Sequence, residues 1–482
     1  MRKYLILGLA LGLGIFTRSY QYLDRFNYAH DNDLASWIVR DIVIDKHLRL
    51  IGQLTSSPGV YIGALWYYLQ IPFYLAGHMD PIYVPILAIL VGVAAIASLY
   101  WVMAKVFSPG AGSIAALLYA TSWSISLTEH DVVPTTPVFL WTIWFFYAIN
   151  LLLQGNKKGL WIVAVLSGLI WHFNLALVFS VPLVIGVLIY KWRQFKWQDL
   201  VGPAVLALIV SLPLLFFEAR HNFSQLRAIV GGTSPTVEIT LGWKMHQIFF
   251  YAAKNVNNLF WVKPDPLSWY LVPLALIAVG VYLQRVKKIS IAQALLIVAW
   301  WGSYIIIFAL NPLNLSEYYL NGVSIIWIVI LALFLTSLLK RFRWAVVIFL
   351  ALVMMENLYV VINQRIDHSG YIQKKALVGE IVKDAKAHNY PCVAVSYMTD
   401  QGRDLGYRHW FWLANLKVKT PASEAPVYTI VFPHTRAGRL DQTFGSLGLI
   451  YPDYYRYTKA SIDQNCQGDN QNLTLPMFGF TK

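Results

Sequence analysis

Charged residues are scarce in this chain. They make up 13% of its 482 residues, whereas apolar residues make up 57% and the mean hydropathy is +0.53. An average chain carries roughly a quarter charged residues, so most of this surface must meet lipid rather than water. The composition therefore excludes a water-soluble enzyme, a coiled coil and a disordered chain.

Cysteine and several common site motifs are also missing or rare. The only cysteines, Cys392 and Cys466, are too few for a disulfide framework and lack the paired spacing of a zinc site. The sequence has no P-loop, no G-x-G-x-x-G, no H-E-x-x-H and no C-x-x-C. Use of a nucleotide sugar on the cytoplasmic side is therefore unsupported. The absence of an internal repeat weakens the interpretation as an inverted-repeat transporter.

What the chain does have is hydrophobic runs, of which those of about 17 to 25 residues can cross a bilayer. The first run follows Arg2 and Lys3 like a signal peptide, but no small-residue cleavage site comes after it, so we interpret it as a retained anchor. The fifth and sixth runs are short and compatible with one bent hairpin. The eleven predicted spans are 4–16, 81–107, 111–127, 132–153, 160–171, 176–190, 200–217, 267–283, 289–310, 319–339 and 344–361.

The formal net charge of +14 sits mostly between these runs, which favours membrane orientation over nucleic acid as its explanation. Cationic residues in short loops stay on the cytoplasmic side. The opposite loops, 129–131, 172–174 and 311–316, contain no Lys or Arg. The pattern predicts a cytoplasmic N-terminus and, after eleven crossings, an extracytoplasmic C-terminus in a plasma-membrane protein. The cations of the predicted inner side are Arg2, Lys3, Lys105, Lys157, Lys158, Lys191, Arg193, Lys196, Arg285, Lys287, Lys288, Lys340, Arg341 and Arg343.

The sequence thus predicts a polytopic α-helical membrane domain over residues 1–364 and a small extracytoplasmic α/β domain over 365–482. In the second part, 371–388 has helical periodicity, 392–397 and 427–432 are typical of buried strands, and 408–416 can form another helix. Both cysteines lie there, on the oxidising side, where a disulfide can form. Two free buried thiols are the alternative.

The first outer loop carries the most informative residues. The segment 33–46 predicts a helix in the membrane interface, and the glycine-punctuated aromatic stretch 50–68 predicts a second one. Acidic residues at a lipid boundary are expensive unless they serve a site, and Asp31 stands at the start of the first helix. It is either a helix N-cap or a carboxylate that takes a proton from a hydroxyl or holds a metal, and the two roles are compatible.

These residues resemble a known family. The string Asp31-Asn32-Asp33, with Leu50-Ile-Gly52-Gln-Leu-Thr55-Ser-Ser-Pro58-Gly59 and Tyr67-Tyr68, is similar to the GT-C superfamily of polyprenyl-phosphate-sugar glycosyltransferases. Family 39, with the protein O-mannosyltransferases and the aminoarabinose transferase of lipid A, is the most similar branch, and Phe217-Glu218-Ala-Arg220-His221 fits it as well. The resemblance implies a catalytic role for Asp31. Because Asn32 stands where the family often has Glu, a role shared with Asp33 is left open.

Two further segments supply candidates for the site. Glu129, His130 and Asp131 are predicted in the second outer loop, where the resemblance implies a second acidic residue that orients the acceptor or a divalent ion; a solvated helix cap is the alternative. Arg220 and His221 follow the seventh span and suit a phosphate, because a guanidinium forms paired hydrogen bonds to oxygens. Snorkelling to lipid head groups, or a structural pair of Arg220 with Glu218, are the alternatives.

Aromatic residues complete the predicted site. Tyr61, Tyr67 and Tyr318, together with His130, are candidates for lining the substrate, although tyrosines at this depth are commonly interfacial belt residues. The metal, if any, is unknown, with Mg²⁺ or Mn²⁺ compatible with the carboxylates.

The predicted function is an inverting membrane glycosyltransferase that moves a sugar from a polyprenyl-phosphate carrier to an acceptor on the outer face. The acceptor is a glycan, a lipid or a protein, the surrounding partners are membrane lipids, and no nucleic acid is expected. A secondary transporter or lipid flippase is one alternative, but it requires ionisable residues deep within spans. A noncatalytic membrane scaffold is the other.

Overall fold

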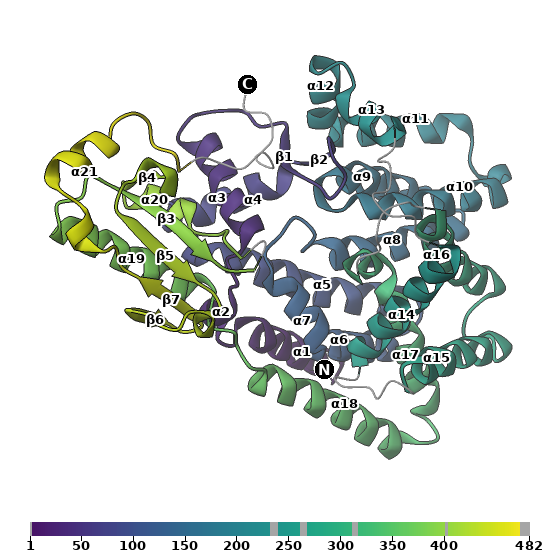
Figure 1. Cartoon of the computed structure of the whole chain (residues 1–482). Helices are drawn as coiled ribbons and strands as arrows, with labels where there is room; N and C mark the ends of the chain where they lie inside the picture. Colours follow the sequence, from purple (N-terminus) through teal and green to yellow (C-terminus); the bar gives the residue numbers. More distant parts are fainter. Residues whose placement is uncertain (1, 232–239, 261–267, 311–316, 401–402, 473–482) are drawn as a thin grey trace.

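The computed structural model describes residues 2–231, 240–260, 268–310, 317–400 and 403–472. Helices dominate the part before Asn363 (Figure 1), as the long apolar runs predict. The predicted short loop 311–316 lies outside the described residues. The helices of the membrane part are α1 (Arg2–Ser19), α5 (Val84–Val106), α6 (Pro109–Thr121), α7 (Trp123–His130), α8 (Val138–Leu153), α9 (Lys158–Phe173), α10 (Val181–Tyr190), α11 (Trp197–Val210), α12 (Leu212–Arg220), α13 (Ser224–Gly231), α14 (Leu241–Phe260), α15 (Ser268–Arg285), α16 (Ile291–Leu310), α17 (Asn321–Leu338) and α18 (Arg343–Asn363).

Each predicted span contains a helix, but the helices differ in length. Within the described ranges, four are long and apolar enough to cross a membrane, namely 81–106, 291–310, 318–338 and 343–363. The pair α11 and α12 passes the same test with a bend of 64° between them, next to Pro213 in the first turn of α12. The other predicted spans correspond to shorter apolar helical stretches of 10 to 17 residues, namely 4–19, 138–153, 158–173, 175–190 and 270–285, or, for 111–127, to two consecutive helices. The polytopic helical membrane fold is confirmed, and the number of eleven crossings stays a prediction.

The segment between α1 and α5 forms a compact layer at one end of the bundle. The first predicted helix, 33–46, is present as α3 (His30–Val43), but the stretch 50–68, predicted as a second helix, begins as an antiparallel hairpin. Gly59, with φ of 78°, stands in its turn, where a glycine adopts the left-handed conformation without strain. The elements of this layer are α2 (Tyr22–Arg25), α3 (His30–Val43), β1 (Ile51–Leu54), β2 (Tyr61–Gly63), α4 (Leu65–Ala76) and the 3₁₀ turn η1 (Pro81–Tyr83).

The C-terminal part is the predicted small α/β unit, with a five-stranded mixed sheet in the order β4-β3-β5-β7-β6. Strand β3 is parallel to β4 and β5, whereas β7 is antiparallel to both β5 and β6. Of the two alternatives for the cysteines, the structure has the disulfide, which joins β3 to the end of α21. The elements are α19 (Tyr371–Ala387), β3 (Cys392–Met398), α20 (Arg408–Leu413), β4 (Lys417–Lys419), β5 (Val427–Val431), β6 (Gln442–Phe444), β7 (Leu447–Ile450) and α21 (Lys459–Asn465).

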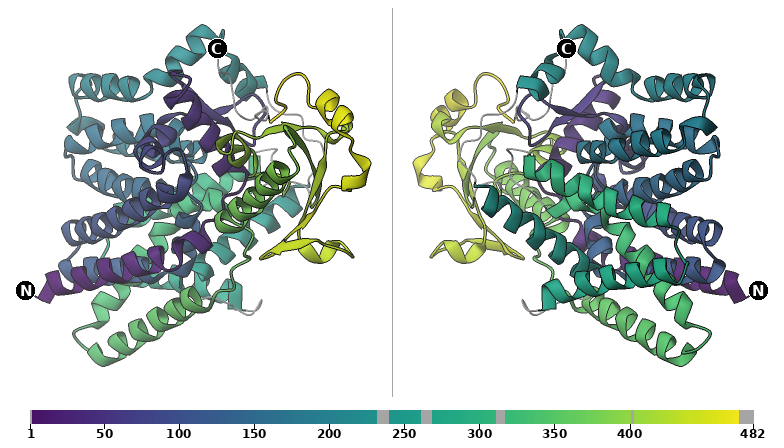
Figure 2. Two further views of the ribbon diagram at one scale, coloured as in Figure 1. Left: turned by 90° about the vertical axis from the view of Figure 1, so that its left-hand side faces the viewer. Right: turned by 90° about the vertical axis from the view of Figure 1, so that its right-hand side faces the viewer.

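The C-terminal unit and the layer between α1 and α5 share one hydrophobic core. The ring centroids of Tyr28 and Trp410 are 5.0 Å apart, and Tyr371 donates its backbone N–H to the carbonyl of Phe26 at 2.9 Å. Figure 2 shows the sheet at the end of the molecule away from the N-terminus. The segment that leads into α3 is therefore held from both sides, by the bundle and by the sheet unit. The boundary at residue 365 stays a prediction.

One long helix was missed by sequence reasoning. Helix α14 lies between the predicted spans 200–217 and 267–283. The sequence analysis assigned no helix there, because polar residues break the apolar run that a hydropathy window needs. Its buried face includes Ile248, Val256 and Leu259, and Asn255 accepts a hydrogen bond from Ser324 of α17 at 2.7 Å. The periodicity of its apolar residues was the available signal.

Candidate active site

The β1–β2 hairpin carries the residue that holds Asp31. On β1, Gly52 lies flat against the ring of Tyr67, since a Cβ at this glycine would be 2.1 Å from that ring. The next residue, Gln53, donates its side-chain N–H to Asp31 Oδ1 at 2.9 Å and accepts from the Tyr67 hydroxyl at 3.1 Å. Because a carboxylate accepts only, this contact fixes the orientation of the Gln53 amide. Gln53 was not among the predicted site residues.

Asp31 is the second residue of α3 and is partly exposed. The predicted N-cap role is wrong, because Ala29 is the N-cap and its N–H is accepted by the side chain of Asn32. Within the described part of the chain, the second oxygen of Asp31, Oδ2, accepts no hydrogen bond. Asp31 is thus held at one oxygen and open at the other, the arrangement that a proton acceptor needs.

Asp131 approaches Asp31 from the loop between α7 and α8. The Asn32 amide donates to the carbonyl oxygens of Asp131 and Val132 at 3.1 and 3.4 Å, and so ties this loop to α3. Val132 has φ of 48°, a strained conformation for a β-branched residue. The Asp131 side chain is open to solvent but has protein on most sides, and this burial together with the charge of Asp31 raises its pKa to about 6.

Asp33 belongs to a different environment. It is buried, and its carboxylate accepts the backbone N–H of His409 at 3.1 Å. Burial raises its pKa to about 6, opposed by that hydrogen bond and by the charge of Lys374. Asp33 therefore contacts the C-terminal unit rather than the Asp31 pair, and its predicted catalytic role has no support in this geometry.

Glu129 likewise lies apart from the Asp31 pair. Its Oε2 is 2.6 Å from Arg18 Nε of α1, and its Oε1 accepts from the Tyr119 hydroxyl at 2.8 Å, with both ionic side chains buried. His130 has Nδ1 2.6 Å from the carbonyl oxygen of Ser126, and burial lowers its pKa to about 4. These contacts tie α1, α6 and α7 together, so of Glu129, His130 and Asp131 only Asp131 lies close enough to feel the charge of Asp31.

The segment predicted to bind phosphate is joined to the same hairpin. Gln225 of α13 accepts the backbone N–H of Tyr61 at 2.6 Å, and the Tyr61 ring lies 6.4 Å from that of Phe217 in α12. Arg220 ends α12 with an exposed side chain, and His221 stacks on Phe217 with centroids 4.1 Å apart. Glu218, the alternative partner of Arg220, instead accepts from the backbone N–H of Leu226 at 3.3 Å.

Two tyrosines, Tyr318 and Tyr319, lie near the turn of the hairpin. The Tyr319 hydroxyl is 2.9 Å from Ser56 Oγ, and its neighbour Tyr318 is 42% exposed. Tyr318 is thus accessible to a ligand, whereas the fully buried Tyr67 acts through Gln53 and is not accessible. Among the described residues, no group of three or more His, Cys, Asp or Glu side chains is placed to hold a metal ion.

Comparison with known proteins identifies the fold. No family model matches the chain, and no curated protein sequence matches it. Among solved structures it is similar to ArnT from Cupriavidus metallidurans bound to undecaprenyl phosphate, with a TM-score of 0.58 and 11% identity over 94% of this chain and 98% of that one. The apo state of the same protein gives a TM-score of 0.57 and 10% identity over 92% and 97%. The chain therefore has the GT-C fold, as its sequence resemblance implies.

Proposed function

We propose that this protein is a membrane glycosyltransferase that transfers a sugar from a polyprenyl-phosphate carrier to an acceptor hydroxyl on the outer face of the membrane. The observation that carries the proposal is the Asp31 carboxylate, fixed at Oδ1 by Gln53, open at Oδ2 and paired with the perturbed Asp131. Perturbed carboxylate pairs are typical of catalytic sites. The GT-C fold, whose neighbour ArnT binds undecaprenyl phosphate, supports the class of donor.

In the proposed reaction the acceptor hydroxyl oxygen attacks the anomeric carbon of the donor sugar. The bond from that carbon to the phosphate oxygen breaks, and its electron pair leaves with the polyprenyl phosphate. The hydroxyl proton goes to Asp31 Oδ2, while Asp131 orients the hydroxyl from the other side. A single displacement of this kind inverts the anomeric configuration.

The donor phosphate gains negative charge as the bond breaks, so preorganised cations beside it accelerate the step. Arg220 is proposed as this cation, with His221 as a second contact to the phosphate, because α12 and α13 contact the hairpin that also positions Asp31. The hairpin would then set the distance between the base and the leaving group. Tyr318 is proposed to contact the sugar, since a partly exposed ring at the edge of the site offers a stacking surface.

The test is a transfer assay with purified protein in nanodiscs, a panel of polyprenyl-phosphate sugars and a glycan, a lipid and a peptide as acceptors. The proposal expects release of polyprenyl phosphate that depends on both a donor and an acceptor. Movement of the intact lipid across proteoliposomes without sugar transfer would instead identify a flippase, and the proposal would be wrong.

The activity should depend on pH through Asp131. Its pKa of about 6 lies above the usual range, so the protonated form accumulates as the pH falls through 6 and the orienting charge is lost. We expect kcat/KM to rise from pH 5 to a plateau above pH 7. In Asp131→Asn the inflection near pH 6 should vanish, and its persistence would refute the assignment.

Arg220 should contribute to donor use. A charged hydrogen bond is worth roughly 1.5 to 3 kcal/mol, so Arg220→Ala should lower kcat/KM for the donor by about 10- to 150-fold. The kcat/KM of Arg220→Lys should lie between that of Arg220→Ala and that of the wild type. Arg227, another exposed arginine of the same region, offers the control Arg227→Ala, because its guanidinium donates to the carbonyl of Asn222. Unchanged donor kinetics in Arg220→Ala would remove it from the site.

A further inference from the structure

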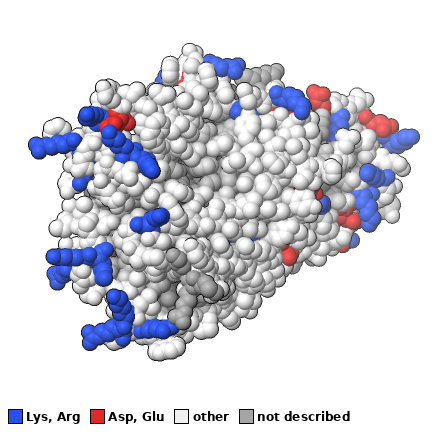
Figure 3. All heavy atoms as spheres, turned by 180° about the vertical axis from the view of Figure 1, so that it is seen from behind, with Lys and Arg blue, Asp and Glu red and all other residues white. Residues whose placement is uncertain are grey.

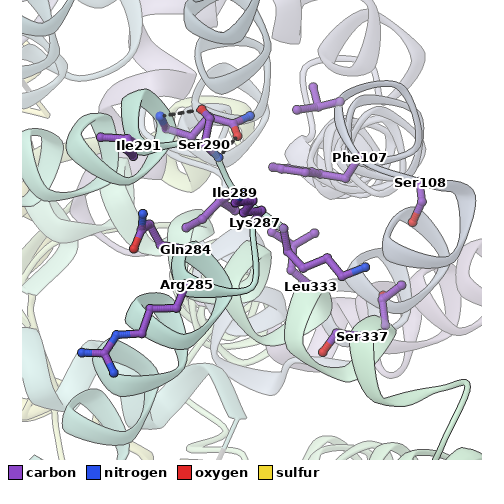
Figure 4. Close-up of a pocket in the computed structure, with 14 residues that line it drawn as sticks. Phe107, Ser108, Gln284, Arg285, Lys287, Ile289, Ser290, Ile291, Leu333 and Ser337 are labelled. Carbon is purple, nitrogen blue, oxygen red and sulfur yellow. Dashed lines mark hydrogen bonds between the residues drawn. The ribbon is translucent and has the colours of Figure 1, made fainter.

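A cavity lies at the opposite end of the bundle from Asp31. It has a volume of about 870 Å³ and is lined by the turn between α15 and α16, by the turn after α5 and by the last turns of α17 (Figure 4). The length of helix α17 gives the separation between the cavity and the hairpin that contacts Asp31. The helix begins just after Tyr319, which contacts Ser56 of the hairpin, and ends beside the cavity 18 residues later. At 1.5 Å per residue this is roughly 27 Å, close to the thickness of the hydrocarbon core.

The lining combines cations with an apolar wall. Arg285, Lys287 and Lys288 come from the α15–α16 turn, and Phe107 and Leu333 lie on the other side with the hydroxyl of Ser337. None of the lining residues is acidic. Within the described part of the chain the three cations make no ion pair with a carboxylate. Figure 3 shows the molecule from behind, with Lys and Arg side chains gathered at the cavity end and few acidic side chains among them.

The backbone at Lys287 supplies an independent observation. Lys287 has φ of 57°, and the turn closes with its N–H on the carbonyl of Gln284 at 3.0 Å and the N–H of Lys288 on the carbonyl of Leu283 at 2.9 Å. Such helix ends usually carry glycine at the left-handed position, because a side chain there costs free energy. The backbone conformation alone would favour glycine at residue 287, so the lysine there is explained by its side chain rather than by the turn.

Apolar side chains continue from the cavity along α16 toward the membrane. Ile291, which lines the cavity, is 66% exposed, and Leu295, one turn further, is 64% exposed. A soluble phosphate compound gains no free energy from contact with such an apolar surface, whereas an acyl chain that lies against it does. Basic pockets between membrane helices are suited to anionic lipid head groups.

We propose that this cavity binds the phosphodiester head group of an anionic membrane phospholipid, with an acyl chain against Ile291 and Leu295. Its lysines and arginine neutralise the phosphate, and Ser108, whose Oγ accepts the N–H of Ala111, donates its own O–H to a head-group oxygen. The site is separate from the proposed donor site, so this proposal does not depend on the proposed transfer reaction.

The test uses the full chain in detergent with added dioleoylphosphatidylglycerol, or dioleoylphosphatidylcholine as the neutral lipid. Native mass spectrometry should show one retained phosphatidylglycerol and no retained phosphatidylcholine, and Tm should rise only with the anionic lipid. The double variant Lys287→Gly/Lys288→Gln should bind phosphatidylglycerol about 30-fold more weakly, since each cation at the membrane surface contributes roughly a factor of five. The glycine relieves the backbone at residue 287, so a loss of binding cannot be attributed to a destabilised turn.

The matched control is Arg193→Gln/Lys196→Gln, which removes two exposed cations outside the cavity lining. It should bind phosphatidylglycerol as the wild type does. An equal loss in both double variants would mean that the lipid responds to diffuse charge, and unchanged binding in Lys287→Gly/Lys288→Gln would likewise overturn the site. If millimolar inorganic phosphate raised Tm as much as the lipid does, the occupant would be a soluble phosphate compound and the proposal would be wrong.

Discussion

Replacing Asp31 by Asn is expected to reduce sugar transfer by about 10²- to 10⁴-fold, the usual contribution of a general base. The amide keeps the size of the side chain and an oxygen that accepts from Gln53, so the fold should be retained. What is lost is the ability of Oδ2 to take a proton. The measurement is kcat/KM for release of polyprenyl phosphate, with Tm and donor binding as checks on folding.

The matched control is the neighbouring carboxylate, two residues away on the same helix. In Asp33→Asn the amide oxygen still accepts from the N–H of His409, and a buried charge is removed, so transfer should stay near the wild-type rate. An inactive Asp33→Asn beside an active Asp31→Asn would mean that the base has been assigned to the wrong residue. Equal loss in both would point to the loop as a whole.

The second large effect is expected at Glu129, on stability rather than on chemistry. Glu129→Gln leaves the buried guanidinium of Arg18 without its counter-charge, and breaking a buried ion pair from one side costs roughly 3 to 5 kcal/mol. The pair is tightly enclosed, since a Cβ at Gly92 of α5 would lie 2.4 Å from Arg18 Nε. The variant should show a clearly lowered Tm in detergent.

A compensating variant separates the structural role from a catalytic one. Arg18→Met/Glu129→Met removes both charges and fills the space with apolar atoms, which often restores stability at such sites. It should recover most of the lost Tm and retain transfer within about tenfold of the wild type. A stable but inactive double variant would return Glu129 to the list of catalytic residues.

Local patterns in the sequence were sufficient for most of the helices and for part of the C-terminal sheet. Apolar runs placed a helix in every predicted span, and the patterns around Cys392 and Val427 gave two strands of the C-terminal sheet, β3 and β5, but not β4, β6 and β7. The pattern failed where two periodicities were mixed, at the hairpin near Gly52, and where polar residues interrupted a long helix, at α14.

The sequence by itself determined that this is a polytopic membrane protein and that its polar chemistry gathers at the ends of its helices, because burial of apolar runs and exclusion of charge from lipid are properties of composition. Only the tertiary structure decided which carboxylate accompanies Asp31. Residues two apart on a helix point to opposite sides, so Asp33 turns to His409. Asp131 lies 100 positions after Asp31 in the chain, and the hydrogen bond from the Asn32 amide to its carbonyl holds it beside Asp31. Glu129 lies two residues before Asp131 but pairs with Arg18 instead. Such pairings depend on contacts between distant segments, which local sequence patterns do not contain.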